Sequence, residues 1–268
     1  MKTRTLLVIF IAVLAGLLAV YFWKSQLGEK KPVPVAQTPP SPPPAAQPAP
    51  PVPAPKPPAA AEPEKPLPTL AESDPAMRES LSELFPRQNL GDLFFLKHFI
   101  QRFVLMVDNL PRHELPYNRL PVKPASGRFL TTGEEGSEFL SPANYKRYTP
   151  YVRLAELVDT GRLVAVYARF YPLFQEAYQQ LGYPSGNFNH RLIEVIDHLL
   201  AAPDVQGPIR VVHPMVRYKF ADPDLEALSA GQKILIRMGP DNAGKVKAKL
   251  RDIRRELTAR IRLTPPAG

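Results

Sequence analysis

The sequence predicts a mainly α-helical fold, with an N-terminal transmembrane helix, a disordered proline-rich linker, and one helical globular domain that includes a small β-hairpin. Three observations predict this arrangement. Residues 5–23 contain no charged residue and no histidine. Seventeen of the 37 residues in 32–68 are proline. From residue 69 onwards, apolar residues recur every three or four positions, the spacing that places them on one face of a helix.

The predicted anchor is residues 6–23, an unbroken apolar run of 18 residues that follows the short basic segment 1–5. At about 1.5 Å per residue this run spans about 27 Å, close to a bilayer core of about 30 Å. Tyr21, Phe22 and Trp23 close it, as interfacial aromatic residues do. A cleaved signal peptide is the alternative, but the run is longer than its usual apolar segment and no small-residue cleavage pattern follows. We therefore expect an uncleaved anchor.

The charges that flank this anchor do not fix its orientation in the membrane. Lys2 and Arg4 precede it, but Lys24, Lys30 and Lys31 follow it, so the positive-inside rule does not decide. The very short basic N-terminus favours a signal-anchor in a bacterial inner membrane, with the body in the periplasm. The reversed topology, with a cytoplasmic body, stays open. The chain contains no cysteine, which fits either compartment.

Residues 24–68 are expected to form a linker. Proline fixes φ and lacks an amide donor, so the proline-dense stretch 32–68 excludes helix and sheet. Such a chain extends by about 3.1 Å per residue, which gives a reach of about 115 Å at most. Motifs of the PxxP type occur here, but any proline-rich tract matches them by chance. The linker therefore predicts a body that acts at a distance from its own membrane.

The body, residues 69–263, is long enough for one well-packed domain, and a short tail follows at 264–268. A helix begins at Ser73, with an apolar face. A second, over 92–109, carries apolar residues round more than half of its circumference, which predicts a central and nearly buried helix. Prolines and glycines interrupt the pattern after it, and the stretch 127–140 predicts a short hairpin with glycines in its turn.

Residues that favour the first turn of a helix predict further helix starts, at Thr149, Asn187 or Asn189, Asp222, Ser229 and Pro240. The apolar pattern over 161–181 contains Pro172, which must break or kink that helix, and Gly182 ends it. The alternating stretch 209–220 predicts an extended arm or strand. The last helix, over 240–261, carries a single apolar stripe.

Two groups of polar residues in the middle of the body are candidates for binding. Tyr145 and Tyr148 flank Arg147, and tyrosine can line a groove for a sugar or peptide through its apolar ring and polar tip. Lys233 and Arg237 lie four residues apart, on one side of a helix, where they could hold a carboxylate or phosphate. A second aromatic stripe lies on the proline-containing helix. Core packing is the preferred interpretation of both aromatic stretches.

Charge singles out the last helix. Residues 69–239 carry 19 basic and 19 acidic residues, whereas residues 240–268 carry eight basic and three acidic ones. Lys247, Arg251 and Arg254 are the candidate binding residues there. Such a helix can meet anionic lipid head groups, an acidic envelope protein or cell-wall polymer, and the alternative is a solvated face. A membrane-tethered body argues against nucleic acid as a partner.

The sequence predicts no catalytic residue, no metal and no cofactor. His190, Glu194 and His198 share one helix face, but their spacing matches no metal motif and that face is expected to be solvated. The motifs of serine and cysteine nucleophiles are absent, and so is a glycine-rich phosphate loop. An ordinary polar helix face is the preferred interpretation of the histidines.

Four sequence blocks of the body stand out: NYKRYTPYV (144–152), YPLFQEAYQQLGYP (171–184), FNHRLIEVIDHLL (188–200) and FADPDLEALSAGQKILIRMGPDN (220–242). Together they resemble a bacterial family of membrane-anchored proteins classed only as a domain of unknown function. The resemblance covers about residues 70–257. It implies a single fold and a layout with an N-terminal membrane helix and a proline- or alanine-rich linker, and it implies no activity.

The stretch 229–243 also faintly resembles a motif of lytic transglycosylases, which cleave cell-wall glycan. Those enzymes need an upstream Glu-Ser pair whose glutamate acts as general acid and base. Just before this stretch Ala227 follows Glu226, so this catalytic element is missing at that place. We therefore expect a non-enzymatic envelope protein that binds or scaffolds an envelope partner or cell-wall polymer. A cell-wall-cleaving enzyme and, with reversed topology, a membrane-tethered cytoplasmic recruiter are the alternatives.

Overall fold

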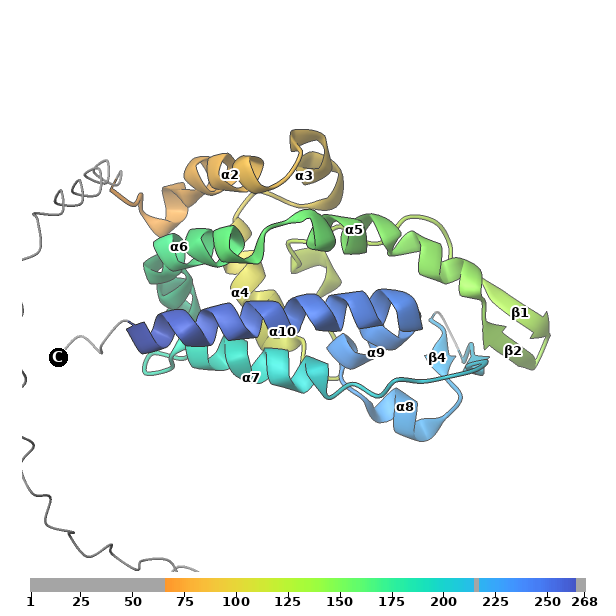
Figure 1. Ribbon diagram of the computed structural model, residues 1–268. Helices are drawn as coiled ribbons and strands as arrows, with labels where there is room; N and C mark the ends of the chain where they lie inside the picture. Colours follow the sequence, from red (N-terminus) through yellow and green to blue (C-terminus); the bar gives the residue numbers. More distant parts are fainter. Residues whose placement is uncertain (1–65, 215–216, 264–268) are drawn as a thin grey trace, which may run out of the picture. The chain divides into compact units, whose positions relative to one another are not determined.

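The computed structural model describes residues 66–214 and 217–263, which are coloured in Figure 1. The predicted anchor at 6–23, the residues before it, the linker up to residue 65 and the tail after residue 263 lie outside the described residues. Within the described residues, no helix is long and apolar enough to cross a membrane. The described chain forms a mainly helical domain with two small two-stranded sheets.

Helix α4 (Phe99–Asn109) lies at the centre of the helical core. It packs against α2 (Ser73–Leu84), α6 (Thr160–Gln180) and α7 (Phe188–Leu200). Ile100 and Val104 on α4 are only 0% and 1% exposed. The prediction of a central and nearly buried helix is therefore confirmed for α4.

Helix α10 (Pro240–Leu263) completes the core from another side. It packs against α5 (Thr149–Leu157), α6, α7 and α9 (Ala230–Arg237), and Figure 1 shows it running alongside α7. Its apolar stripe faces inward, because Leu257 is buried and Val246, Leu250 and Ile253 pack against the main core. The predicted terminal helix is confirmed.

The single helix predicted over 92–109 is wrong in its first half. The chain forms two helices there, α3 (Arg87–Leu93) and α4, with an extended segment between them. In that segment the Phe95 amide donates to the Pro121 carbonyl at 2.7 Å. Backbone pairing with a distant segment thus replaces the helical hydrogen bonds that the apolar spacing predicts.

The start of α4 is capped from another helix. His98 takes a left-handed φ of 54°. The Asp74 carboxylate on α2 accepts hydrogen bonds from the amides of His98 and Phe99, at 2.8 and 3.2 Å. Amides in the first turn of a helix have no partner within the helix, so this distant carboxylate fixes where α4 begins.

Helix α6 runs unbroken through Pro172, so the alternative of a break in this helix is wrong. A proline inside a helix removes one amide donor and crowds the preceding turn. Phe170, Leu173 and Phe174 are all buried beside it. Burial of apolar side chains on both sides of the proline holds this turn in the helix. The helix ends as predicted, with Gly182 at a φ of 114°.

A small β region lies at one end of the body (Figure 1). Strand β1 (Thr131–Glu134) pairs antiparallel with β2 (Ser137–Leu140), which confirms the predicted hairpin. The arm predicted over 209–220 contains two short antiparallel strands, β3 (Val211–Val212) and β4 (Lys219–Phe220). These strands share a second, smaller core with α9, formed by Leu140, Ile209, Val211, Phe220 and Ile236.

The caps predicted at Asn187, Asp222 and Ser229 are confirmed, whereas Thr149 does not cap α5, whose N-cap position is Tyr148 and has no side-chain cap. Three side chains cap helices by accepting backbone hydrogen bonds: Asn187 for α7, Asp222 for α8 (Pro223–Ala227) and Ser229 for α9. Ser229 also forms a capping box with Gln232, in which each side chain satisfies the amide of the other residue. Gly239, with a φ of 85°, ends α9. The segment from Asp222 onwards is therefore a helical corner that leads into α10.

Candidate functional site

Tyr145, Arg147 and Tyr148 lie in and beside the short 3-10 helix η3 (Pro142–Arg147). The Arg147 guanidinium donates to the backbone carbonyls of residues 125–127, so it holds the preceding loop in place. Tyr148 packs against the main core. Burial raises the pKa of its hydroxyl, although neighbouring arginines lower it in part. The three side chains therefore have structural contacts, and their binding role stays a prediction.

Tyr145 packs on the backbone of Gly239, which gives a testable consequence. A Cβ added to Gly239 would lie 2.5 Å from the Tyr145 ring, at a backbone φ of 85° that strains any side chain. We expect Gly239→Ala to lower the free energy of unfolding by about 2–3 kcal/mol, from strain and displacement of the ring. Urea unfolding measures this loss.

Gly244→Ala on α10 is the matched control for Gly239→Ala. Nothing lies within 4 Å of the Cβ added there, so the methyl group should stabilise the helix by about 1 kcal/mol. Opposite signs for the two alanine variants are the expected result. Equal effects would contradict the close packing of Tyr145 on Gly239.

Lys233 and Arg237 already have partners within the chain. Lys233 is 6% exposed, and its ammonium contacts the carboxylate of Glu226 at 3.1 Å. Arg237 donates to the Tyr218 carbonyl, and its guanidinium lies 5.0 Å from the centroid of the Phe220 ring. Both cations join α9 to the segment that precedes it. Their predicted grip on a carboxylate or phosphate ligand stays untested.

Glu226 is the internal partner of Lys233. Burial raises the pKa of its carboxyl, but the hydrogen bond from the Phe220 amide and the Lys233 ammonium outweigh burial and leave that pKa below its ordinary value. A depressed pKa in the folded state means that the ionised carboxylate stabilises the fold. This contribution is present above the unfolded pKa of about 4.3 and is lost as the pH falls through the lower folded value.

The comparison of Glu226→Gln with the unchanged chain tests this assignment. We expect the variant to be less stable by about 2 kcal/mol at neutral pH, because Lys233 loses its charged partner. The difference in unfolding free energy should shrink below about pH 4, where the chain with Glu226 loses the stabilisation that the ionised carboxylate provides. Urea unfolding over an acid pH series measures it. A difference that does not vary with pH would show that ionisation of Glu226 plays no part.

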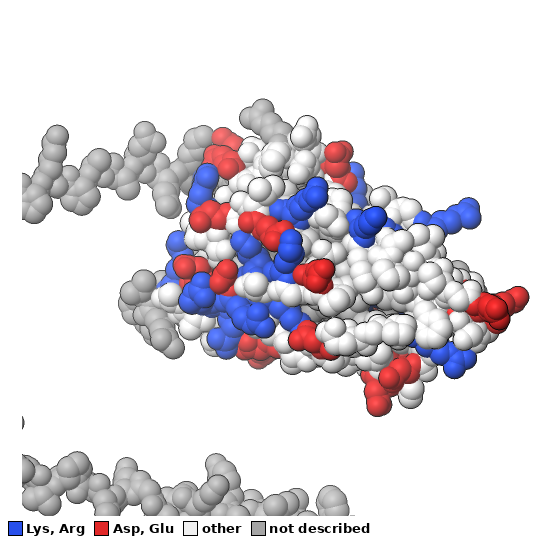
Figure 2. Space-filling model, turned by 45° about the vertical axis from the view of Figure 1, so that its right-hand side comes forward, with Lys and Arg blue, Asp and Glu red and all other residues white. Residues whose placement is uncertain are grey.

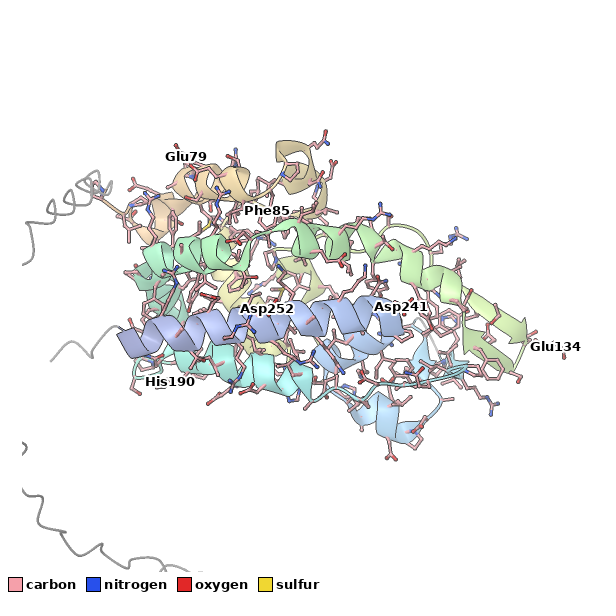
Figure 3. All side chains as sticks on the ribbon, viewed as in Figure 1. Glu79, Phe85, Glu134, His190, Asp241 and Asp252 are labelled. Atoms are coloured by element: carbon pink, nitrogen blue, oxygen red, sulfur yellow. The ribbon has the colours of Figure 1, made fainter. Side chains whose placement is uncertain are left out.

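Lys247 and Arg254 join α10 to its neighbours. The buried Lys247 ammonium contacts Asp204 at 2.6 Å and lowers the pKa of that carboxyl. Arg254 forms two hydrogen bonds with the carboxylate of Asp197 on α7. Arg251 is exposed on the same helix. Other cations of α10 also have partners: Lys245 contacts Glu156, Lys249 the Val158 carbonyl, and Arg255 the carboxylate of Asp252, which Figure 3 labels.

The ion pairs of α10 bear on the prediction that this basic helix binds an anionic partner. Figure 2 shows basic and acidic side chains interleaved on one face of the body. Three cations of α10, Lys245, Lys247 and Arg254, are therefore matched by carboxylates outside this helix. These pairs hold α10 in place, and the prediction that this helix binds an anionic partner remains open.

The three residues of the histidine-containing face of α7 do not form a cluster. His190 and Glu194 are exposed, as the sequence predicts, whereas His198 turns to Ser229, with Nε2 2.8 Å from the hydroxyl oxygen. Within the described residues, no group of three or more potential ligands could hold a metal ion.

The second aromatic stripe lies in the core, which confirms the preferred interpretation. Phe170, Phe174 and Tyr178 on α6 are buried. The Tyr167 hydroxyl donates to the Asn189 side chain at 2.6 Å, and burial raises the pKa of this hydroxyl above its ordinary value. The polar tip of Tyr167 is thereby satisfied, while its ring faces an internal space.

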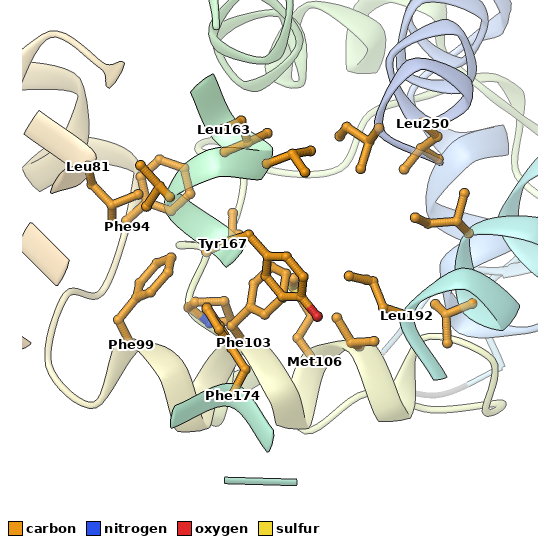
Figure 4. A pocket seen from close by; sticks show the side chains of 18 of the residues that line it. Leu81, Phe94, Phe99, Phe103, Met106, Leu163, Tyr167, Phe174, Leu192 and Leu250 are labelled. Atoms are coloured by element: carbon orange, nitrogen blue, oxygen red, sulfur yellow. The ribbon is translucent and has the colours of Figure 1, made fainter. Parts of the chain in front are cut away.

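That space is an apolar cavity of about 320 Å³ inside the helical body. Side chains of α2, α3, α4, α6, α7 and α10 line it, together with residues of the segments before α3, before and after α4, and after η2 (Tyr117–Arg119). Figure 4 shows side chains around this space, among them Leu81, Phe99, Met106, Tyr167, Leu192 and Leu250. Among the lining side chains only Tyr167 carries a polar group, and that group is bonded to Asn189.

The size of this cavity is unusual for a protein core. Interiors are packed like organic crystals, with few voids larger than one water molecule. At about 24 cal/mol per Å³, a fully enclosed void of about 320 Å³ would cost about 8 kcal/mol, and because this space is partly open that figure is an upper limit. Water gains little there, because an apolar wall offers it almost no hydrogen bonds. The arrangement therefore favours an apolar occupant.

None of the eight residues predicted as a binding site lines the cavity. Its walls come from the inward stripes of several helices, which sequence spacing marks only as core. The aromatic stripe of α6, which supplies Tyr167 and Phe174, is the sequence feature that comes nearest to it. A periodic pattern shows which side chains of a helix point inward. It does not show whether the inward side chains of different helices contact one another or leave a space between them.

The comparisons with known proteins agree with the resemblance seen in the sequence blocks. A family model described as "Protein of unknown function (DUF3014)" matches residues 99–254. No curated protein and no solved structure matches the chain. The matched region contains α4 to most of α10 and spans more than half of the 268 residues. The chain therefore belongs to the family described as protein of unknown function (DUF3014).

Proposed function

We propose that this chain is a non-enzymatic, membrane-anchored protein of the bacterial cell envelope whose helical body binds the hydrocarbon chain of a lipid. The observation that carries the proposal is the apolar cavity of about 320 Å³. The apolar run 6–23 supports a body tethered to a bilayer, which is a source of such chains, and the proline-rich stretch after it would let the body reach about 115 Å from that bilayer at most.

The energetics of the cavity fit a chain of moderate length. A buried methylene contributes about 0.8 kcal/mol, so about ten methylenes would offset even the upper limit of about 8 kcal/mol for the empty space. The lining supplies no charge and no free hydrogen-bonding group, so it would favour the hydrocarbon part of a ligand over a sugar or peptide.

The environment of Glu226 argues against the cell-wall-cleaving alternative. A glutamate that acts as general acid needs a raised pKa, so that it is protonated at neutral pH. The Phe220 amide and the Lys233 ammonium leave the pKa of Glu226 below its ordinary value, so this carboxylate is ionised and engaged in internal contacts. A binding protein is the more consistent function.

Photocrosslinking of the full chain tests the proposal. Cells that produce it are given palmitate bearing a diazirine and an alkyne, irradiated, and analysed by peptide mass spectrometry. We expect adducts on peptides of α4, α6 and α7, suppressed by excess unlabelled palmitate. Adducts confined to residues 6–23 would report only contact with the bilayer and would overturn the proposal of a lipid site in the body.

The envelope location has a separate test. A periplasm-active and a cytoplasm-active reporter are fused in turn after Gly268. We expect activity from the periplasmic reporter. Activity from the cytoplasmic reporter would overturn the envelope location and move the lipid-binding body to the cytoplasmic face of the membrane.

A further inference from the structure

We propose that the ligand of the cavity is a single-chain amphiphile with an anionic head group, and that this head group binds in the surface groove between α3 and α5. The inference rests on the proposed function, because it names the ligand of the same cavity. The groove has a volume of about 740 Å³ and is bordered by α3, the end of η3, and α5.

Helix α3 separates the cavity from the groove. Leu90 on α3 lines the cavity, whereas Asn89, Asp92 and Leu93 of the same short helix line the groove. A chain that leaves the cavity past α3 therefore emerges directly into the groove. An amphiphile with its tail inside would place its head there.

Helix α3 is short, with seven residues, and no side chain caps its first turn, although the Lys123 ammonium donates to the Gly91 carbonyl farther along it. A Cβ added to Gly91 would meet nothing within 4 Å, so this side of the helix is open. A short helix without an N-cap is less stable than one with a cap, which favours passage of a chain at this position.

The groove carries an excess of positive charge that the chain does not neutralise. Lys146 and Arg153 are exposed and line it, and within the described residues neither side chain has a hydrogen bond or an ion pair. The α10 cations Lys247 and Arg254, in contrast, are paired with carboxylates. Asp92 is the acidic residue that lines the groove, so two cations face one carboxylate.

The remaining lining suits the junction between head and tail of an amphiphile. Leu157 is 71% exposed at the groove, an apolar side chain in contact with water. The Thr149 hydroxyl and the Asn89 amide add hydrogen-bonding groups beside the cations. Carboxylate and phosphate heads both offer anionic oxygens to lysine and arginine, so this chemistry favours a fatty acid or a lysophospholipid of acidic type.

Competition against the photoactivatable palmitate tests the head group. The full chain is reconstituted in phosphatidylcholine nanodiscs, and crosslinks on cavity peptides are competed by palmitate, by palmitoyl lysophosphatidate, or by monopalmitoylglycerol, which has the same tail and no charge. Inorganic phosphate alone is a fourth competitor. We expect each anionic amphiphile to compete about tenfold better than the neutral one at low salt, and inorganic phosphate not to compete.

Charge variants assign this preference to the groove. Lys146→Glu combined with Arg153→Glu should remove the anionic preference and leave competition by monopalmitoylglycerol unchanged. Asp92→Asn should act in the opposite direction and increase the preference about threefold, because it removes the one carboxylate. Arg78→Glu combined with Lys219→Glu makes the same charge change at exposed positions outside the groove and should have no effect.

The outcomes separate the two proposals. Equal competition by charged and neutral amphiphiles would overturn the head-group site while the cavity still binds a chain. The head-group site is also overturned if the control pair removes the preference as strongly as the groove pair. Absence of any crosslink on cavity peptides would overturn the lipid-binding function itself, and with it this inference.

Discussion

Replacement of Asp108 by asparagine is expected to lower the free energy of unfolding by about 3–5 kcal/mol. The Asp108 side chain, at the end of α4, is only 2% exposed. Its two carboxylate oxygens contact Arg112 at 2.6 Å and Arg191 at 3.1 Å, and the Tyr183 hydroxyl donates to it at 3.3 Å. This carboxylate therefore joins α4 to the start of α7 and to the loop before it.

Asparagine keeps the size of the side chain but removes the charge that both arginines face. Arg191 is 26% exposed, and besides the neutral asparagine it would keep only its longer contact of 3.6 Å with the exposed Glu194. Removing one member of a buried ion pair is much more costly than replacing both members, because the other charge stays desolvated. Urea unfolding of the full chain, followed by circular dichroism, measures the loss.

Asp197→Asn is the matched control for the buried pair. Asp197 and Arg254 also form an aspartate–arginine pair, but their side chains are 47% and 42% exposed. Water already solvates both groups, so the expected loss is about 1 kcal/mol or less, and added salt should reduce it further. Equal losses for Asp108→Asn and Asp197→Asn would show that burial does not set the strength of these pairs.

Most helix starts of the body depend on local signals, which is why the sequence predicts them. The caps at Asn187, Asp222 and Ser229 each act on amides two or three residues away. The apolar stripe of α10 spans one helix. Such signals are complete within a short window of sequence, so these helix starts, the hairpin and the mainly helical class could be predicted.

Other features of the body depend on contacts with a distant segment, and for these features the local sequence pattern gives a wrong or incomplete prediction. Asp74 caps α4 from 24 residues away, and Pro121 takes the hydrogen bond that keeps Phe95 out of a helix. The pairing of Lys233 with Glu226 is within reach of sequence spacing, but the burial that makes it structural depends on the surrounding helices. Helical spacing predicts that two cations lie on one side, and it cannot show that they already have partners.

The cavity cannot be predicted from sequence for a further physical reason. Leu192 on α7 and Leu81 on α2 are ordinary core residues by spacing, and only the mutual distance of their helices leaves a space between them. That distance depends on every contact in the body at once. A proposal of lipid binding could therefore come only from the assembled helices.

Enlarging a side chain inside the cavity is expected to raise stability and abolish binding together. Leu192 lines the cavity and is labelled in Figure 4, as is Leu250 on α10. In a closely packed core, a larger side chain costs about 1–3 kcal/mol. In an empty space it adds contacts instead, and cavity filling commonly stabilises by about 0.5–2 kcal/mol. The sign of the change in folding stability therefore shows whether the enlarged side chain enters an empty space or a closely packed core.

We expect Leu192→Phe combined with Leu250→Phe to raise the thermal midpoint of the ligand-free chain and to reduce crosslinking of the palmitate probe on cavity peptides at least tenfold. Crosslinking falls because each probe methylene that no longer fits in the cavity loses about 0.8 kcal/mol of binding free energy, so two methylenes are enough for a tenfold change.

Leu140→Phe is the control, because Leu140 is buried in the second core and does not line the cavity. It should destabilise the chain and leave crosslinking intact. If the double variant destabilises the chain as Leu140→Phe does, while the probe still reacts with α4, α6 and α7, then the space in the helical body is not the lipid site.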